Sequence, residues 1–330
     1  MPAGLWTGLA GKVGEQWAAA VLTPAFAFWA GGLAAWAVPD RWHRLDQWLH
    51  AAPLTVAVAA AVGALILVVV SGTVVERLPL PLLRLLEGYW PRWLGPLRRA
   101  LVRARGRRMR RSEERWQALA AAADEGDTDA RAAFVALDAH LRRVPALAGN
   151  RMPTRLGDVL RAAETWPADK YGLDAPKCWP RLWLVLPETA RKELSDARSS
   201  LDQGAAAWLW GLLFAVWIPW AWWAVIVAIV VPAGAYLWML SAARGYGDLI
   251  ESAFDVHRAA LYEAVGYRAP SDPALEVEAG RALTAYLWHG TPPPTALLRP
   301  TGGDSPGTPP PPHSRVRAAW AWLLSSYRAR

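Results

Sequence analysis

The sequence predicts an all-α integral membrane protein, with a bundle of four transmembrane helices in two hairpins and a cytosolic helical domain inserted between spans two and three. Three observations predict this fold. Long stretches at 17–38, 51–75 and 203–243 hold no charged residue. Hydrophobic residues make up 54% of the chain, above the roughly 45–50% typical of soluble domains. Many of the 22 Trp lie at the ends of apolar runs, where the indole suits the headgroup region of a bilayer.

The first two charge-free stretches predict an N-terminal transmembrane hairpin at 1–77. A helix needs about 20 apolar residues to cross a bilayer, and spans at about 17–38 and 54–75 meet this length. The alternative for the first is a cleaved signal peptide, because Ala35-Trp36-Ala37 resembles a cleavage site. Its apolar core exceeds the roughly 7–15 residues of a signal peptide, which favours a span.

The third charge-free stretch, 203–243, predicts a second transmembrane hairpin. As one straight helix, its roughly 41 residues would measure about 60 Å, twice the hydrocarbon thickness of a bilayer. Pro219 lies near the middle, and a proline removes a helical hydrogen bond and restricts the residue before it. We therefore expect short spans at about 205–218 and 222–240, joined by a turn at Pro219. A re-entrant hairpin or one bent helix is the alternative.

Basic residues near the span ends predict the orientation of the chain. Between Arg77 and Arg111 the sequence has eleven arginines and one acid, Glu87, and such an excess is typical of the cytosolic side of a membrane. With four spans, both termini are then cytosolic. A polybasic segment beside a membrane also attracts anionic lipids, and nucleic acid is a less favoured partner. The arginines expected to face the lipid are Arg98, Arg99, Arg103, Arg107 and Arg108.

The region 78–202 is predicted to be a cytosolic basic and helical domain. We expect a helix from about 100 to 120, and another that reaches Val144 after an interruption at 124–129. The acidic residues of that interruption lack the ligand spacing and the closing Glu of a calcium loop. They predict a solvated turn, with a helix cap at Asp127 or Thr128.

The segment 153–187 is the most distinctive part of this domain. An apolar stripe predicts a short amphipathic helix with Asp158 on its opposite, polar side. The prolines that follow predict a non-helical loop. The polar residues form either a binding or gating site or an ion-pair network that holds the loop, and we favour the network. The stripe consists of Leu156, Val159, Leu160 and Ala163. The candidate polar cluster consists of Arg155, Arg161, Glu164, Tyr171, Asp174 and Arg181.

The C-terminal regions differ in composition. Residues 244–290 are predicted to form a cytosolic helical stalk, antiparallel to a second one at 188–203. Nine prolines in 291–313 predict a disordered linker. In 314–330, apolar residues recur at i, i+3, i+4 and i+7 between arginines, which predicts a basic amphipathic tail that lies on a membrane or binds a partner. Those apolar residues are Trp320, Leu323, Leu324 and Tyr327.

Five short strings stand out between Leu78 and Gly290. They are LEGYW at 86–90, PTRLG at 153–157, LRAAE at 160–164, YGLD at 171–174 and WPRL at 179–182. They resemble a family of uncharacterised bacterial, largely actinobacterial, polytopic membrane proteins. The resemblance implies a bacterial plasma membrane as the location and implies no activity. The family's pattern has Asn at the position of Asp158. A looser likeness, of topology alone, relates the chain to proposed four-span pore-forming effectors of bacterial defence systems.

The sequence contains no catalytic, metal or nucleotide signature. The single cysteine, Cys178, excludes an intrachain disulfide, and the six histidines are scattered without an H-E-x-x-H pair. The string at 8–13 resembles a phosphate loop, but Trp6 stands where the first glycine belongs and Val13 replaces the hydroxyl residue that would bind magnesium. We therefore expect no enzyme activity, no cofactor and no metal.

Three functions stay open at this point. The favoured one is a non-enzymatic, membrane-anchored scaffold or sensor module, which binds anionic lipids and either a second copy of itself or a protein partner. The alternative is an oligomeric pore or channel. Because the spans lack charged residues, a proton-coupled carrier is disfavoured, whereas a pore gated by dewetting is not. An enzyme that acts on lipid is the third.

Overall fold

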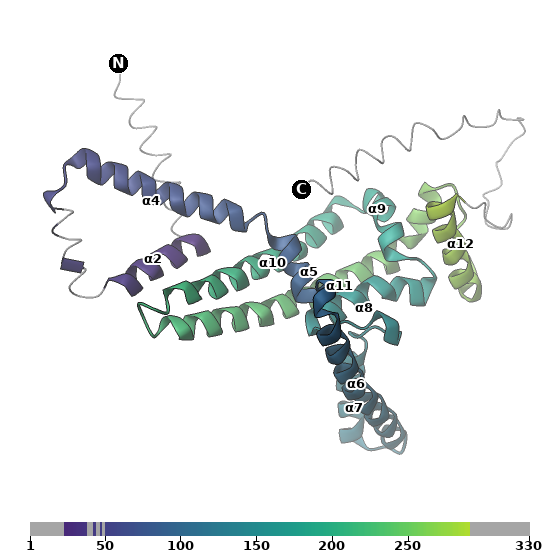
Figure 1. Cartoon of the computed structure of the whole chain (residues 1–330). Coiled ribbons are helices and arrows are strands. Elements are labelled where there is room, and N and C mark those ends of the chain that lie inside the picture. The colour runs from purple at the N-terminus through teal and green to yellow at the C-terminus, as the bar shows by residue number, and fades with distance from the viewer. Residues whose placement is uncertain (1–22, 38–41, 44–46, 48–49, 291–330) are drawn as a thin grey trace, which may run out of the picture.

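The computed structural model describes residues 23–37, 42–43, 47 and 50–290. Every regular element in these ranges is helical (Figure 1), which confirms the predicted all-α class. The linker predicted at 291–313, the basic tail predicted at 314–330 and the beginning and end of the span predicted at 17–38 lie outside the described residues.

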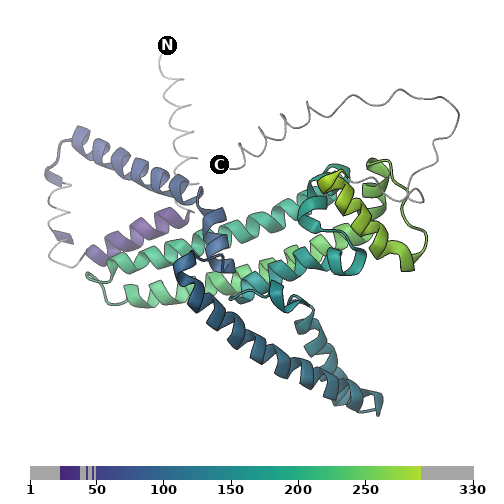
Figure 2. The same cartoon turned by 45° about the vertical axis from the view of Figure 1, so that its right-hand side comes forward.

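Two long antiparallel helices form the axis of the molecule (Figures 1 and 2). α10 covers Glu188–Leu213 and continues as the short 3-10 helix η3 at Phe214–Trp217, and the chain then turns back into α11 at Ala224–Ala264. Pro219 lies in this turn, where its missing N–H interrupts neither helix. A Cβ on Gly204 of α10 would stand 2.5 Å from the side chain of Met239. The two backbones therefore approach each other closely, as small residues allow.

One end of the α10–α11 hairpin is apolar and carries α2 (Pro24–Trp36) and α4 (Leu54–Val75). The ring of Phe28 in α2 lies 5.1 Å from that of Trp210 and 6.1 Å from that of Phe214, between centroids. The indole N–H of Trp29 donates to Ser71 Oγ at 3.0 Å, which joins α2 to α4. α2 is thus held on the hairpin, while α4 leans away from it (Figure 1).

Two helices in the described ranges are long and apolar enough to cross a membrane, namely α4 and α11. α4 has the bounds predicted for the second span, and Val75 is its one buried residue. The apolar part of α11, from Ala224 to Ala243, measures about 30 Å, close to the hydrocarbon thickness. α2, with 13 residues, and the apolar end of α10 are shorter. The count of four spans therefore stays a prediction.

A helical arm projects sideways from the middle of the hairpin (Figures 1 and 2). The chain reaches it through α5 (Pro79–Glu87) and the 3-10 helix η1 (Arg92–Leu94), and the arm consists of α6 (Gly95–Asp124) and α7 (Thr128–Leu141). Asp127 caps α7 through backbone N–H bonds to its Oδ1 of 2.9 and 3.1 Å, so the expected cap is confirmed. Trp116 joins the two helices, because its Nε1–H donates to Asp138 at 3.1 Å. The 3-10 helix η2 (Ala148–Asn150) follows.

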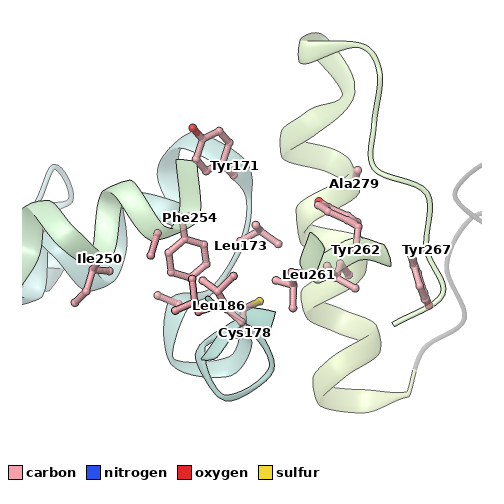
Figure 3. Close-up of a cluster of buried hydrophobic side chains, with 14 of the residues drawn as sticks. Tyr171, Leu173, Cys178, Leu186, Ile250, Phe254, Leu261, Tyr262, Tyr267 and Ala279 are labelled. Atoms are coloured by element: carbon pink, nitrogen blue, oxygen red, sulfur yellow. The ribbon is translucent and has the colours of Figure 1, made fainter. Parts of the chain in front are cut away.

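The charged end of the hairpin is covered by α8 (Arg155–Tyr171), α9 (Ala175–Val185) and α12 (Glu276–His289), the last preceded by the 3-10 helix η4 (Pro273–Leu275). Their apolar side chains surround the end of α11, where Phe254 and Leu261 are fully buried (Figure 3). Burying a large apolar side chain contributes about 1.5–3 kcal/mol. This core, which we call the distal core, thus stabilises the end of the molecule farthest from α4.

Glycines allow α8 and α12 to touch through their backbones. A Cβ on Gly280 of α12 would stand 1.9 Å from the carbonyl oxygen of Tyr171, closer than any side chain permits. Gly172 ends α8 with a φ of 71°, the left-handed conformation that glycine adopts without strain. The position of α12 on the end of α8 therefore depends on these two residues.

The structure corrects the non-helical loop predicted after the amphipathic stripe. α8 continues through Pro167 to Tyr171, and the following segment forms α9, which contains Pro180. Pro176 lies in the first turn of α9, where a missing N–H costs little. Pro167 is fully buried, and we attribute its tolerance to this packing, which offsets the hydrogen bond that a proline removes.

Candidate functional site

Basic side chains converge where α6, the end of α7, α8 and α11 meet. They line a cavity of about 140 Å³, which we call the arginine cavity. The residues come from distant parts of the chain, because α6 supplies Arg105 and α11 supplies Arg244. One acidic residue, Asp158, also lines it. The basic residues are Arg105, Arg108, His140, Arg143, Arg151, Arg155 and Arg244.

Asp158 organises one wall of the arginine cavity. Its carboxylate accepts the backbone N–H of Met152 at 2.8 Å on Oδ1. Oδ2 accepts two N–H groups of Arg105, with Nε at 3.0 Å and Nη2 closer. The carboxylate lies in the first turn of α8, where the helix dipole stabilises a negative charge. Asp158 therefore fastens α6 and the segment before α8 to the start of α8.

The sequence placed Asp158 on the exposed side of its helix, and the structure corrects this. Asp158 is 3% exposed, and it is the one charged residue in the described part of the chain that is buried. Buried carboxylates need a charged or hydrogen-bonding partner. Arg105, which lies 53 positions earlier in the sequence, supplies that partner. The periodicity of residues along α8 gives no information about this contact.

The remaining arginines of the cavity are largely without acidic partners. Arg151 pairs with Glu113 at 3.1 Å, yet its Nε is buried and has no hydrogen-bond partner within the described ranges. The structure gives no ion pair with a described residue for four others. They are Arg108, Arg143, Arg155 and Arg244.

His140 lies close to the arginines of the cavity. Partial burial and the charges of Arg155, Arg244, Arg105 and Arg143 lower the pKa of its imidazole. Each of these guanidinium groups disfavours a second positive charge nearby. The cavity is therefore strongly electropositive, and it attracts anions.

The arginine cavity adjoins the apolar end of the hairpin. Leu240, from the charge-free part of α11, lines it together with Arg244, the first charged residue after the stretch 203–243. If the apolar part of α11 crosses a bilayer, the cavity lies at the height of the lipid headgroups.

Helix α6 distributes the five arginines predicted to face lipid over its surface. Arg99, Arg103, Arg107 and Arg108 are exposed, and Arg98 is half-buried. Arg108 also lines the arginine cavity. Nε of Arg103 donates to the carbonyl of Arg99 at 3.3 Å. The prediction that these side chains contact lipid stays a prediction.

The structure does not bring the six residues of the candidate polar cluster to one site. Arg155 lies at the arginine cavity. Arg161 pairs with Glu164 at 3.0 Å, one helical turn apart on α8. Tyr171 lies at the rim of the distal core (Figure 3) and its hydroxyl bonds to Asp255.

The last two members of that cluster belong to α9. Asp174 caps this helix and pairs with Lys177 at 2.8 Å. Arg181 donates to the carbonyl of Lys177 at 3.0 Å. The backbone N–H of Asp174 also donates to Thr284 Oγ1 of α12 at 3.2 Å, so this residue joins α9 to α12. The choice between a network and a binding site stays a prediction.

A second cavity, of about 250 Å³, is lined by residues of α5, α8, α9, α10 and α11. Glu87, Glu164 and Arg198 line it. Burial and, to a smaller extent, repulsion from Glu164 raise the pKa of the Glu87 carboxyl to about 7. The positive charge of Arg198 lowers this pKa and offsets part of the rise. Glu87 therefore changes charge near neutral pH.

The described residues contain no group of three or more His, Cys, Asp or Glu side chains that could hold a metal ion. Cys178 is 0% exposed, and burial raises the pKa of its thiol to about 11. A buried thiol of this kind is a poor nucleophile. Sequence reasoning did not single out Arg151, His140 or Arg244; the position of Arg244 at the end of an apolar run was the one indication available.

Comparison of the chain with protein-family models, with curated proteins and with solved structures gives no match.

Proposed function

We propose that this protein is a non-enzymatic integral membrane protein, a scaffold or sensor module held on the cytosolic face of a bacterial plasma membrane. The observation that carries the proposal is the continuity of α10 and α11. Each is a single helix that is apolar at one end and charged at the other. The hairpin therefore connects a part suited to lipid with a part suited to water.

The apolar end supports insertion into a bilayer. α4 is 22 residues long, or about 33 Å, and none of its most apolar window is buried within the protein. A soluble monomer rarely exposes so large an apolar surface. The turn of the hairpin adds Trp220 and Trp222, both exposed, and tryptophan is enriched at membrane interfaces.

The charged end supports a binding role on the cytosolic side. The arm of α6 and α7 leaves the hairpin near the arginine cavity, and α6 carries exposed arginines along its length. Anionic lipids attract such residues with about 1 kcal/mol for each one near the surface. We therefore propose that α6 lies against anionic lipid and that the arm presents its outer end to a protein partner.

Accessibility of engineered cysteines tests the placement in whole cells. In a Cys178→Ser background, Trp222→Cys places a thiol in the hairpin turn and Arg107→Cys places one on exposed α6. We expect a membrane-impermeant maleimide to label position 222 in intact cells, and position 107 after lysis alone. If position 222 is labelled only after lysis, the hairpin does not cross the membrane and the proposal fails.

The exposed face of α4 favours one rival function, an oligomeric pore. A Cβ on Gly63 would meet no atom within 4 Å, so another copy of the helix can pack closely there. Ion flux through liposomes that contain the purified chain distinguishes the two functions. A scaffold gives no flux, and flux that persists after deletion of residues 315–330 would favour the pore.

A further inference from the structure

The arginine cavity has a large excess of positive over negative charge. Six arginines line it against one carboxylate, and that carboxylate already accepts two N–H groups of Arg105. Like charges at this density repel each other and reduce the stability of the fold. An anion bound among them removes the repulsion.

The free hydrogen-bond donors of the cavity match a phosphate group. Arg155 and Arg244 come from different helices and have no acidic partner in the described part of the chain. Arg151 is 13% exposed in its side chain, and its buried Nε–H also has no partner there. A guanidinium presents planar, paired N–H donors that bind two oxygens of one phosphate. Three such groups suit a tetrahedral anion with two negative charges better than a carboxylate, which has two oxygens.

The size of the cavity limits the ligand. A water molecule needs about 10–15 Å³ of such space, so 140 Å³ admits a phosphate group and several waters. A nucleic acid duplex requires a long basic surface with many phosphate contacts, which a cavity of this volume, although open to solvent at Arg155 and Arg244, does not provide.

We propose that the arginine cavity binds a dianionic phosphate group, held by Arg151, Arg155 and Arg244, with Arg105 and Asp158 as the fixed wall. Two sources share this chemistry: the phosphomonoester headgroup of a lipid such as phosphatidic acid, and a soluble phosphate compound. Leu240 beside Arg244 places apolar helix surface at the edge of the cavity, which suits the acyl end of a lipid. The proposal names a ligand for the proposed sensor, and its lipid form rests on that membrane placement.

Binding of inorganic pyrophosphate to the full chain in detergent tests the soluble form. Isothermal titration calorimetry on the wild type is compared with Arg155→Gln/Arg244→Gln. The matched control is Arg107→Gln/Arg110→Gln, which removes the same charge from exposed positions of α6 outside the cavity. Because the variant removes two groups that donate charge-assisted hydrogen bonds to the anion, we expect a loss of affinity of at least about tenfold in the cavity variant. Arg155 and Arg244 are exposed as well, so the two variants differ in whether the lost charges line the cavity. The control should change less than about twofold, because its charges do not line the cavity and act on the ligand only through screening solvent.

Nanodiscs distinguish the lipid source from the soluble one. The full chain is incorporated into phosphatidylcholine discs that contain either phosphatidic acid or phosphatidylglycerol, and its thermal unfolding is measured. If the ligand is a headgroup, phosphatidic acid raises the unfolding temperature above that in phosphatidylglycerol, and the cavity variant loses this difference while the control keeps it. If the ligand is soluble, the two lipids act alike and pyrophosphate alone stabilises the protein.

Two results would overturn the inference. One is equal loss of binding in the cavity variant and in the surface control, which would show a diffuse electrostatic effect. The other is the absence of any stabilisation of the wild type by pyrophosphate and by phosphatidic acid. Because the wild type is measured directly, misfolding of a variant cannot hide this second result. Pyrophosphate binding in detergent does not depend on the topology of the hairpin, so the inference and the proposed membrane placement can fail separately.

Discussion

Asp158 offers the most direct test of how the arm is fastened to the rest of the molecule. Asp158→Ala removes the acceptor of two Arg105 donors and of the Met152 N–H. The lost bonds to a charged group are worth about 1.5–3 kcal/mol, and a buried N–H left unpaired costs about 1–3 kcal/mol. Arg105 keeps part of its hydration, because its side chain is 28% exposed. We therefore expect the free energy of unfolding to fall by about 3–4 kcal/mol.

Asp158→Asn separates the two contributions. The amide oxygen can still accept the Met152 N–H, whereas the amide nitrogen faces the Arg105 donors and cannot accept from them. We expect a loss of about 1.5–3 kcal/mol, smaller than that of Asp158→Ala. The control is Asp196→Asn, which removes the same charge from an exposed position of α10.

Denaturant unfolding in mixed micelles gives the free energies, and amide hydrogen exchange shows where the structure opens. Exchange should increase in α6 and in the first turns of α8 while the distal core stays protected. The reasoning is refuted if Asp158→Ala lies within about 0.5 kcal/mol of Asp196→Asn, or if the Asn and Ala variants lose equal stability.

Three further predictions follow from burial and close contact. The Glu87 carboxyl has a pKa of about 7 when folded and 4.5 when unfolded, so the unfolded state loses its proton first as pH rises through this window, and stability falls. Glu87→Gln should flatten this decline, and its unfolding temperature should exceed that of the wild type at pH 8. A wild-type stability that rises over this window would contradict the prediction. Gly280→Ala forces a Cβ against the carbonyl of Tyr171 and should lower the free energy of unfolding by about 1–3 kcal/mol. In the control Gly245→Ala the new Cβ meets no atom within 4 Å, so this change should stabilise α11 slightly. Similar stability changes for both variants would exclude the close contact. Cys178 should react with a thiol reagent at the rate of unfolding, because its side chain is buried and the pKa of its thiol is about 11; fast labelling of the native protein would show that this core opens.

Local rules were sufficient for much of the helical content. The bounds of α4 follow from an apolar run between Pro53 and Glu76, and Asp127 caps α7 because a short acidic side chain can reach the first free N–H groups of a helix. The buried stripe of α8 also follows from periodicity, since Leu156, Leu160 and Ala163 all lie in the core. In each case the deciding interaction involves residues within a few positions of one another.

The remainder depends on tertiary contacts. The continuation of α8 through Pro167 is favoured by burial, which no local pattern near the proline announces. The arginine cavity joins Arg105 to Arg244 across four helices, and a single sequence contains no measure of that proximity. Tyr171 was grouped with Asp174 because they are close in sequence, yet its hydroxyl binds Asp255 on α11.

Helix α11 is a single rigid element that connects the apolar end of the molecule to the distal core. It runs from the hairpin turn to the distal core over 41 residues, about 60 Å, and Pro232, its one internal proline, is buried close to Gly211 of α10. Apolar helices tilt when the bilayer becomes thinner. A tilt of about 10° at the apolar end displaces the far end of such a rod by about 10 Å. If the apolar end of α11 crosses the bilayer as proposed, a change in membrane thickness would therefore move α12 without any chemical step.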